Sequence, residues 1–119
     1  MRVLIVDDSR AMRKIVTREL EAAGFASLTI AEAGSAVDAM AVVDEFNPQL
    51  VLSDWNMPGL TGLDLLKSLR ADGCNVPLVF ITTEASDDMR SAAMEAGAFG
   101  FIIKPFTASD LRDVIVQFA

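Results

Sequence analysis

The sequence predicts a doubly wound α/β domain in which helices cover both faces of a parallel five-stranded sheet. Short apolar runs at residues 3–6, 28–31, 50–53, 78–81 and 99–103 are typical of strands. The stretches between them have helical periodicity, and a repeat of roughly 24 residues suits a strand followed by a helix. Right-handed crossovers return each strand parallel to the one before it, so the whole sheet is expected to be parallel.

Each predicted helix begins at a small hydroxyl residue. The expected caps, in chain order, are Ser9, Ser35, Thr61, Ser86 and Thr107. Ser35, Thr61 and Thr107 are each followed three residues later by an aspartate, which predicts a short-armed capping box. Glycine predicts the ends of the first helix, at Gly24, and of the fourth, at Gly97.

The apolar positions of two helices predict their inner faces. In the first helix these positions are Met12, Ile15, Val16, Leu20 and Ala23. In the fourth they are Met89, Ala92, Ala93 and Ala96, whose small size predicts a shallow contact with the sheet.

Strand composition predicts the order 2-1-3-4-5. Strands one, three and four are almost wholly aliphatic, as interior parallel strands are, whereas Thr29 and Glu32 mark strand two as an edge. This order is the flavodoxin-like (βα)5 arrangement, which binds ligands at the carboxyl ends of strands one and three. No linker divides the sequence, so one domain spanning residues 1–119 is expected, with the chain stopping inside the fifth helix as a trimmed piece would.

Composition excludes several classes of function. A net charge of −7 disfavours nucleic acid and anionic membranes as direct partners. The apolar run at 3–6 is too short for a signal peptide or a membrane span, so a cytoplasmic location is expected. The sequence has no histidine and one cysteine, Cys74, which excludes histidine-dependent nucleophilic catalysis and zinc sites of the histidine or cysteine type.

Polar residues at the strand ends form the candidate site. Asp7 and Asp8 end strand one, Asp54 follows strand three, Thr82 ends strand four and Lys104 ends strand five. Three crowded carboxylates repel one another unless a cation lies among them. Oxygen ligands without histidine or cysteine favour Mg²⁺, with Mn²⁺ as an alternative. One acid could then act as a nucleophile for a phosphoryl group.

Most of these features also have a simpler explanation, whereas Asp54 is harder to explain, because an acid at the end of a buried aliphatic strand is costly unless it reaches solvent or a cation. An Asp-Asp pair before a helix favours the positive end of the helix dipole. Thr82 is a good strand residue, Lys104 fits a solvated surface, and Phe101 fits a core or half-buried strand position. Their combination at one edge of the sheet is what favours an active site.

Four motifs resemble the response regulator receiver family across essentially the whole chain. They are V-D-D-S at 6–9, S-D-W-N-M-P-G at 53–59, I-T-T-E at 81–84 and K-P-F-T at 104–107, and the similarity is strongest to the CheY-like chemotaxis regulators of this family. The resemblance implies that Asp54 accepts a phosphoryl group from a sensor histidine kinase. It also implies that Mg²⁺ is bound by Asp8, Asp54, the backbone carbonyl of Asn56 and, through a water, Asp7.

The same resemblance implies roles for other residues. Lys104 and Thr82 would contact the phosphoryl oxygens, and the Lys104–Pro105 peptide would be cis. Asn56 and Glu84 would tune hydrolysis of the acyl phosphate, so the protein would catalyse its own phosphorylation and dephosphorylation without being a turnover enzyme in the usual sense. Phe101 would switch the face formed by helix four, strand five and helix five, where a downstream protein target binds.

The sequence departs from the chemotaxis regulators at several positions. Phe101 replaces their tyrosine, which removes any contact that needs a phenol hydroxyl but leaves a ring-burial mechanism intact. Asp87, Arg90 and Val114 are unlike a flagellar motor-binding surface, so the downstream partner stays open.

Rival functions remain at this point. A haloacid dehalogenase phosphatase also uses Asp, Lys and Mg²⁺, but its D-x-D motif is absent from strand one. A flavodoxin-like cofactor binder needs a phosphate loop where this chain has acids. A phosphorylation-independent interaction module, or the receiver fragment of a longer regulator with an output domain, is the main alternative.

Overall fold

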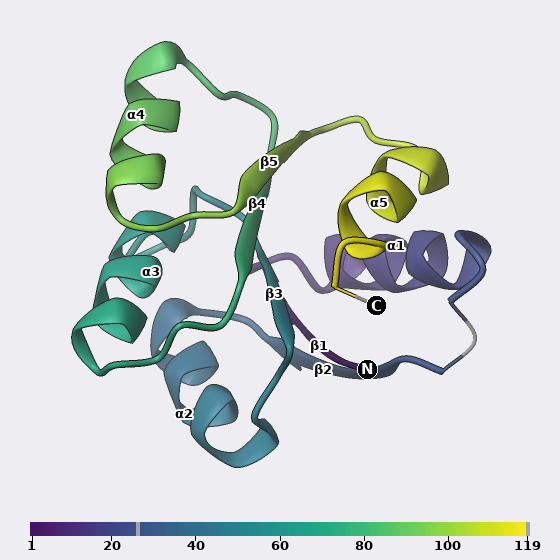
Figure 1. The fold of residues 1–119 in the computed structure, drawn as a ribbon, viewed down its shortest axis with the longest axis horizontal. Coiled ribbons are helices and arrows are strands. Elements are labelled where there is room, and N and C mark those ends of the chain that lie inside the picture. The colour runs from purple at the N-terminus through teal and green to yellow at the C-terminus, as the bar shows by residue number, and fades with distance from the viewer. Residues whose placement is uncertain (26, 119) are drawn as a thin grey trace.

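The computed structural model describes residues 1–25 and 27–118, in which strand and helix alternate along the chain (Figure 1). The strands are β1 (Arg2–Val6), β2 (Thr29–Ala33), β3 (Leu50–Ser53), β4 (Leu78–Thr82) and β5 (Gly100–Ile103). The helices are α1 (Arg10–Ala22), α2 (Ala36–Phe46), α3 (Gly62–Ala71), α4 (Asp87–Glu95) and α5 (Ala108–Ile115). Neighbouring strands are parallel in the order β2-β1-β3-β4-β5, which confirms the predicted flavodoxin-like fold.

The helices cover both faces of the sheet, with α1 and α5 on one face and α2, α3 and α4 on the other (Figure 1). Successive side chains of a strand point to opposite faces. In β1, Val3 and Ile5 accordingly pack in the core beneath α1 and α5, whereas Leu4 and Val6 pack in the core beneath the other three helices. Interior strands are therefore buried on both sides, and this is why their sequences are continuously aliphatic.

Each predicted cap residue precedes its helix and accepts a hydrogen bond from a backbone N–H of the first turn. The capping box is complete at α3, where Thr61 N donates to Asp64 Oδ2 at 2.9 Å, and at α5, where Thr107 N donates to Asp110 Oδ2 at 2.8 Å. Among the described residues, no such return bond forms at Ser35. The backbone there is more extended, with φ of −156° against −79° at Thr61 and −108° at Thr107.

Strands β1, β4 and β5 each differ from the predicted range by one residue at one end, and the predicted ends of β2 and of the fifth helix are wrong by more than one residue. Strand β2 covers Thr29–Ala33 instead of 28–31, because it pairs residue by residue with β1 from Thr29 opposite Arg2 to Ala33 opposite Val6. Its length is thus set by its neighbour and not by its own apolar run. The fifth helix ends at Ile115 instead of continuing to the end of the chain, and Phe118 N bonds back to the Ile115 carbonyl in a tight turn. Ala119, to which the fifth helix is predicted to continue, lies outside the described residues.

The inner face of α1 is also narrower than predicted. Val16 and Leu20 are buried, Ala23 beyond the helix is buried, and Met12 packs partly against the same core. Ile15 is 41% exposed, because it lies one residue away from the buried stripe that Val16 and Leu20 form at helical spacing. The prediction that Ile15 faces the sheet is therefore wrong.

The predicted shallow contact between α4 and the sheet is confirmed. Ala93 is fully buried, and Met89, Ala92 and Ala96 are only partly covered. Within residues 1–25 and 27–118, no helix has the length and apolar character needed to cross a membrane.

Candidate functional site

Two backbone hydrogen bonds fix the positions of the acidic residues that directly follow the central strands β1 and β3. Asp7 N donates to the Ala33 carbonyl at 3.1 Å, and Asp54 N donates to the Val6 carbonyl at 2.9 Å. The parallel ladder thus continues one residue beyond β1 and β3 and delivers both acids to the same edge of the sheet. Carboxylate oxygens of Asp7, Asp8 and Asp54 lie within 4.8 Å of one another, as the predicted site requires.

The Asp7 carboxylate is enclosed by the fold. The residue is 5% exposed, its Oδ1 accepts a hydrogen bond from Ser9 N at 2.9 Å, and its Oδ2 lies 3.4 Å from Lys104 Nζ. Burial raises the pKa of this carboxyl above its usual value, and the charge of Asp54 acts in the same direction. The Ser9 N–H and the Lys104 ammonium oppose that rise without cancelling it.

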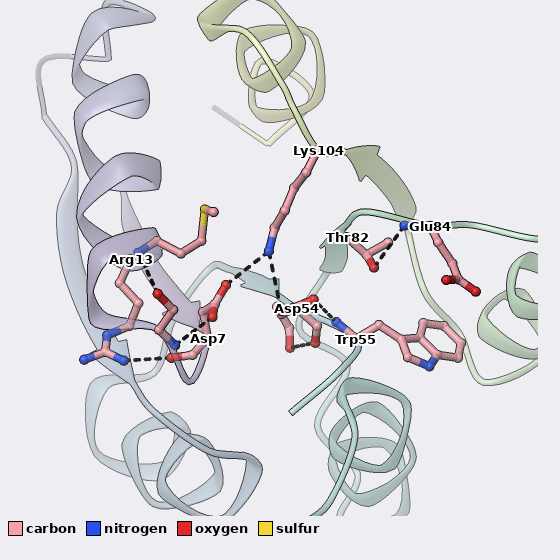
Figure 2. Close-up of polar contacts among 10 residues, drawn as sticks. Asp7, Arg13, Asp54, Trp55, Thr82, Glu84 and Lys104 are labelled. Carbon is pink, nitrogen blue, oxygen red and sulfur yellow. Dashed lines mark hydrogen bonds and ion pairs between the residues drawn. The ribbon is translucent and has the colours of Figure 1, made fainter. Parts of the chain in front are cut away.

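Asp54 lies opposite Asp7 and shares the same lysine (Figure 2). Its Oδ1 accepts a hydrogen bond from Trp55 N at 2.7 Å, and its Oδ2 lies 3.4 Å from Lys104 Nζ. Charge-assisted bonds of this kind are usually about 2.8 Å long. The ammonium is therefore shared between two acids and is not tightly bound to either one.

Lys104 reaches the acids from the end of β5. Its backbone N donates to the Thr82 carbonyl at 2.8 Å, which fixes the start of its side chain beside β4. The peptide that follows, Lys104–Pro105, is cis, as the resemblance implied. With all three acids ionised, three negative charges and one ammonium leave two uncompensated negative charges at this edge.

This donor set fits a hard divalent cation. All of its ligand atoms are oxygens, the surplus of negative charge is two, and burial already disfavours the charged form of Asp7. Asp8 is exposed, so a cation bound between the acids could keep several of its waters. Asp7, Asp8 and Asp54 are the residues whose side chains could hold such an ion.

The remaining predicted site residues surround this centre, and within the described residues no hydrogen bond joins their side chains to its carboxylates. Thr82 is fully buried, and its Oγ1 accepts a hydrogen bond from Glu84 N at 3.5 Å, the outer limit for such a bond (Figure 2). Asn56 and Glu84 are both exposed, on the loops that follow β3 and β4. The fold thus gathers the three acids, pairs Lys104 with Asp7 and Asp54, and leaves Thr82, Asn56 and Glu84 around them.

Phe101 belongs to an aromatic cluster that begins next to Asp54. The Trp55 and Phe80 ring centroids are 4.8 Å apart, and Phe101 lies 5.4 Å from Phe80 and 6.1 Å from Trp55. The guanidinium carbon of Arg90 lies 5.0 Å from the centre of the Phe101 ring, within the range of a cation–π contact. Phe101 is therefore half-buried between the acid-bearing loop and α4.

Sequence reasoning missed Gly62, which lies directly against the Asp54 backbone. A Cβ at residue 62 would overlap the Asp54 carbonyl oxygen and lie 2.9 Å from Phe80 Cε1. The Gly62 N–H also donates to the Trp55 carbonyl at 2.8 Å. A glycine directly after a helix cap, where most residues would be better helix formers, is a signal that could have indicated this close approach.

Comparison with known proteins gives one consistent family. The family model described as "Response regulator receiver domain" matches residues 3–116. The chain is 40% identical to the chemotaxis protein CheY of Pseudomonas aeruginosa over 117 residues, covering 97% of this chain and 93% of that protein. It is 41% identical to the chemotaxis protein CheY-3 of Vibrio cholerae over 115 residues, covering 95% and 87%.

Solved structures agree with this result. The structure of the chemotaxis protein CheY4 of Vibrio cholerae superposes with a TM-score of 0.88 at 29% identity, covering 99% of this chain and 98% of that one. A CheY-like receiver domain protein from Methanospirillum hungatei gives a TM-score of 0.86 at 28% identity, covering 98% and 90%.

Proposed function

The chain belongs to the response regulator receiver family, and from this premise we propose that it is a phosphorylation-activated switch of a two-component system whose phosphoacceptor is Asp54. The observation that carries the proposal is the ammonium of Lys104, held 3.4 Å from both Asp54 and Asp7 beside a third acid. Such an arrangement combines a nucleophilic carboxylate with positive charge for an incoming phosphoryl group.

The proposed cofactor is Mg²⁺, with Mn²⁺ as a substitute. Asp8 and Asp54 would hold it directly, together with the backbone carbonyl of Asn56, and Asp7 would hold it through a water. When bound, the ion neutralises the carboxylates and the phosphoryl oxygens.

In the proposed reaction, a carboxylate oxygen of Asp54 attacks the phosphorus atom of the donor. The bond between phosphorus and the donor nitrogen or oxygen breaks, and the donor atom keeps the electron pair. Lys104 is loosely shared between Asp7 and Asp54, so its ammonium can turn to a phosphoryl oxygen without losing a short bond. The Trp55 N–H keeps one carboxylate oxygen of Asp54 oriented throughout.

The proposed phosphodonor is a sensor histidine kinase, and the proposed second reaction is hydrolysis of the acyl phosphate. The exposed side chains of Asn56 and Glu84 lie on the two loops that border the acids, where they can influence the approach of water. The protein would thus catalyse its own phosphorylation and dephosphorylation, and the signal would be short-lived.

The proposed switch joins Thr82 to Phe101. A charge-assisted bond from Thr82 to the phosphoryl group contributes about 1.5–3 kcal/mol, while moving an equilibrium from 1:99 to 99:1 requires about 5.5 kcal/mol. Lys104 and the aromatic cluster must therefore contribute. Thr82 and Lys104 would shift inward together, and Phe101 would turn into the space that the threonine leaves.

The surface that responds would be the face of α4, β5 and α5. A groove of about 460 Å³ lies on this face, bordered by Phe101, Ile103, Lys104 and Val114. A downstream protein is the proposed partner, in chemotaxis or a related pathway, and the proposed location is the cytoplasm. Neither nucleic acid nor an anionic membrane is a proposed partner, because the net charge of −7 repels both.

The experiment that tests the proposal is phosphorylation by a small donor. The protein is incubated with Mg²⁺ and acetyl phosphate or phosphoramidate, and its intact mass is measured with and without Mg²⁺, with Asp54→Asn as control. One added phosphoryl group that depends on Mg²⁺ and is absent from the variant supports the proposal.

Two other outcomes identify the rival functions. Continuous release of phosphate from many donor molecules, without a detectable phosphorylated protein, indicates a phosphatase. A folded protein that binds Mg²⁺ but gains no mass indicates a phosphorylation-independent interaction module.

A further inference from the structure

Arg13, on α1, makes two hydrogen bonds to separate elements near the acids. Its Nη1 donates to the backbone carbonyl of Asp7 at 2.7 Å, and its Nε donates to Glu32 Oε1 on β2 at 2.9 Å. The Arg13 side chain is 17% exposed, against 44% for that of Glu32. An arginine this enclosed has lost rotamer freedom and part of its hydration, and its rigid fork joins two acceptors that a point charge could not hold together.

The carbonyl that Arg13 holds belongs to the peptide that joins Asp7 to Asp8 (Figure 2). The Asp7 N–H is already bonded to the Ala33 carbonyl, and the Asp7 carboxylate accepts a bond from Ser9 N. Arg13 binds the one remaining polar group of Asp7. Because a peptide unit is planar, a fixed carbonyl also fixes the direction in which the chain enters Asp8.

We propose that Arg13 is a positioning residue for the cation site: it sets the peptide plane between Asp7 and Asp8 and so keeps both carboxylates within reach of one ion. This inference rests on the proposed function, which assigns Mg²⁺ to these acids. Arg13 itself does not approach the ion, because its guanidinium is bonded to a carbonyl and to Glu32 on the α1 side of the loop.

Electrostatics alone predicts the opposite effect of removing Arg13. A positive side chain near the acids repels a divalent cation, so its loss would tighten Mg²⁺ binding if charge were its only influence. If Arg13 positions the acids, its loss weakens Mg²⁺ binding. A third possibility, that Arg13 only braces α1 against β2, predicts a change in unfolding temperature with no change in the affinity of the folded protein.

The test is a titration of the full chain with MgCl₂. Binding is followed through the fluorescence of Trp55, the sole tryptophan, whose backbone N–H donates a hydrogen bond to Asp54 Oδ1. The variants are Arg13→Gln and Arg13→Lys, with Arg18→Gln as the matched control. Arg18 is exposed on the same helix, so its substitution removes the same charge at a position open to solvent. Thermal unfolding in EDTA identifies the temperature range in which each variant is folded.

We expect Arg13→Gln to raise the Mg²⁺ dissociation constant about tenfold, the size of effect usual for residues that orient metal ligands. Arg18→Gln should leave it unchanged or lower it slightly. Arg13→Lys keeps the charge but not the fork, so its dissociation constant should lie between those of the wild type and Arg13→Gln. If Arg13→Gln does not fold, the test uses Arg13→Lys alone, and weaker Mg²⁺ binding by Arg13→Lys than by the wild type supports the inference.

A dissociation constant for Arg13→Gln equal to or lower than that of the wild type would overturn the inference, as would equality of Arg13→Lys with the wild type where only that variant folds. A wild-type protein that does not respond to MgCl₂, with binding also absent by calorimetry, would instead remove the cation site from the proposed function. The two failures are thus distinguishable.

Discussion

Replacement of Gly62 by alanine tests how closely α3 must approach the loop that carries Asp54. The added Cβ would overlap the Asp54 carbonyl oxygen and press on the Phe80 ring. Neither neighbour moves easily. The Asp54 carbonyl also accepts a bond from Ser53 Oγ at 2.8 Å, and Phe80 is fully buried in the core.

Two effects of opposite sign determine the result. Overpacking costs about 1–3 kcal/mol, and the upper part of this range applies because the obstacle is backbone and not the end of a flexible side chain. Alanine is better than glycine within a helix by about 1 kcal/mol, and Gly62 is the first residue of α3. The net expectation is a loss of about 1–2 kcal/mol, or a fall of about 4–8 °C in unfolding temperature for a domain of this size.

Thermal and urea unfolding measure the loss of stability, and the rate of phosphorylation by acetyl phosphate measures the displacement of Asp54. Gly100→Ala is the matched control, because a Cβ at that position would have nothing within 4 Å. That variant should stay within about 0.5 kcal/mol of the wild type. A Gly62→Ala protein that unfolds at or above the wild-type temperature and is phosphorylated at the wild-type rate would refute this reasoning.

Three further predictions follow from the site and its surroundings. Burial raises the pKa of Asp7, so this carboxyl contributes favourably to stability below its ordinary pKa of 3.8, and the contribution is lost as pH rises through the raised pKa. Asp7→Asn should therefore unfold at a higher temperature than the wild type at pH 7 in EDTA, and an equal or lower temperature would contradict this. Hydrogen bonding from Thr61 lowers the pKa of Asp64, so this carboxylate contributes to stability above its ordinary pKa of 3.8, and the contribution is lost as pH falls through the lowered pKa. The difference in stability between wild type and Asp64→Asn, measured in urea, should shrink from pH 6 to pH 2.5, and a constant difference would show that the Thr61 hydrogen bonds are not its source. Phe101→Ala should cost about 2 kcal/mol of stability and remove the dependence of partner affinity on phosphorylation. An unchanged ratio between the affinities of the phosphorylated and unphosphorylated protein would show that ring movement is not needed.

The fold could be predicted from the sequence because its strongest signals are repeated. Aliphatic runs, hydroxyl caps and glycine stops recur in phase, and the alternation of strand and helix leaves few topologies open. The boundaries of β2 could not be predicted, because an edge strand is bounded by its pairing with β1 and this is a tertiary property. The exposure of Ile15 was missed for a similar reason, since it depends on where the helix rests on the sheet.

The acids and the lysine of the site could also be predicted, because parallel strands end at one edge and charged residues there are conspicuous in an aliphatic sequence. Gly62 and Arg13 were missed because they act through backbone carbonyls. The glycine after the Thr61 cap indicates a close approach but does not identify the Asp54 carbonyl as its neighbour, and nothing in the sequence marks the Asp7 carbonyl as the partner of an arginine six residues later. Contacts of this kind become visible only once the loops have a conformation.

The bridge from Lys104 to the acids also links the site to completion of the fold. Lys104 lies 97 residues from Asp7 and 50 residues from Asp54 along the chain, and it directly follows β5, which comes after the other strands of this sheet in the chain. Until β5 pairs with β4, the acids lack their ammonium and the hydrophobic core lacks its outer strand. Any reaction that needs both the acids and the ammonium is therefore unavailable to a chain in which β5 has not yet paired, so chemical competence at this site reports that β5 has joined the sheet.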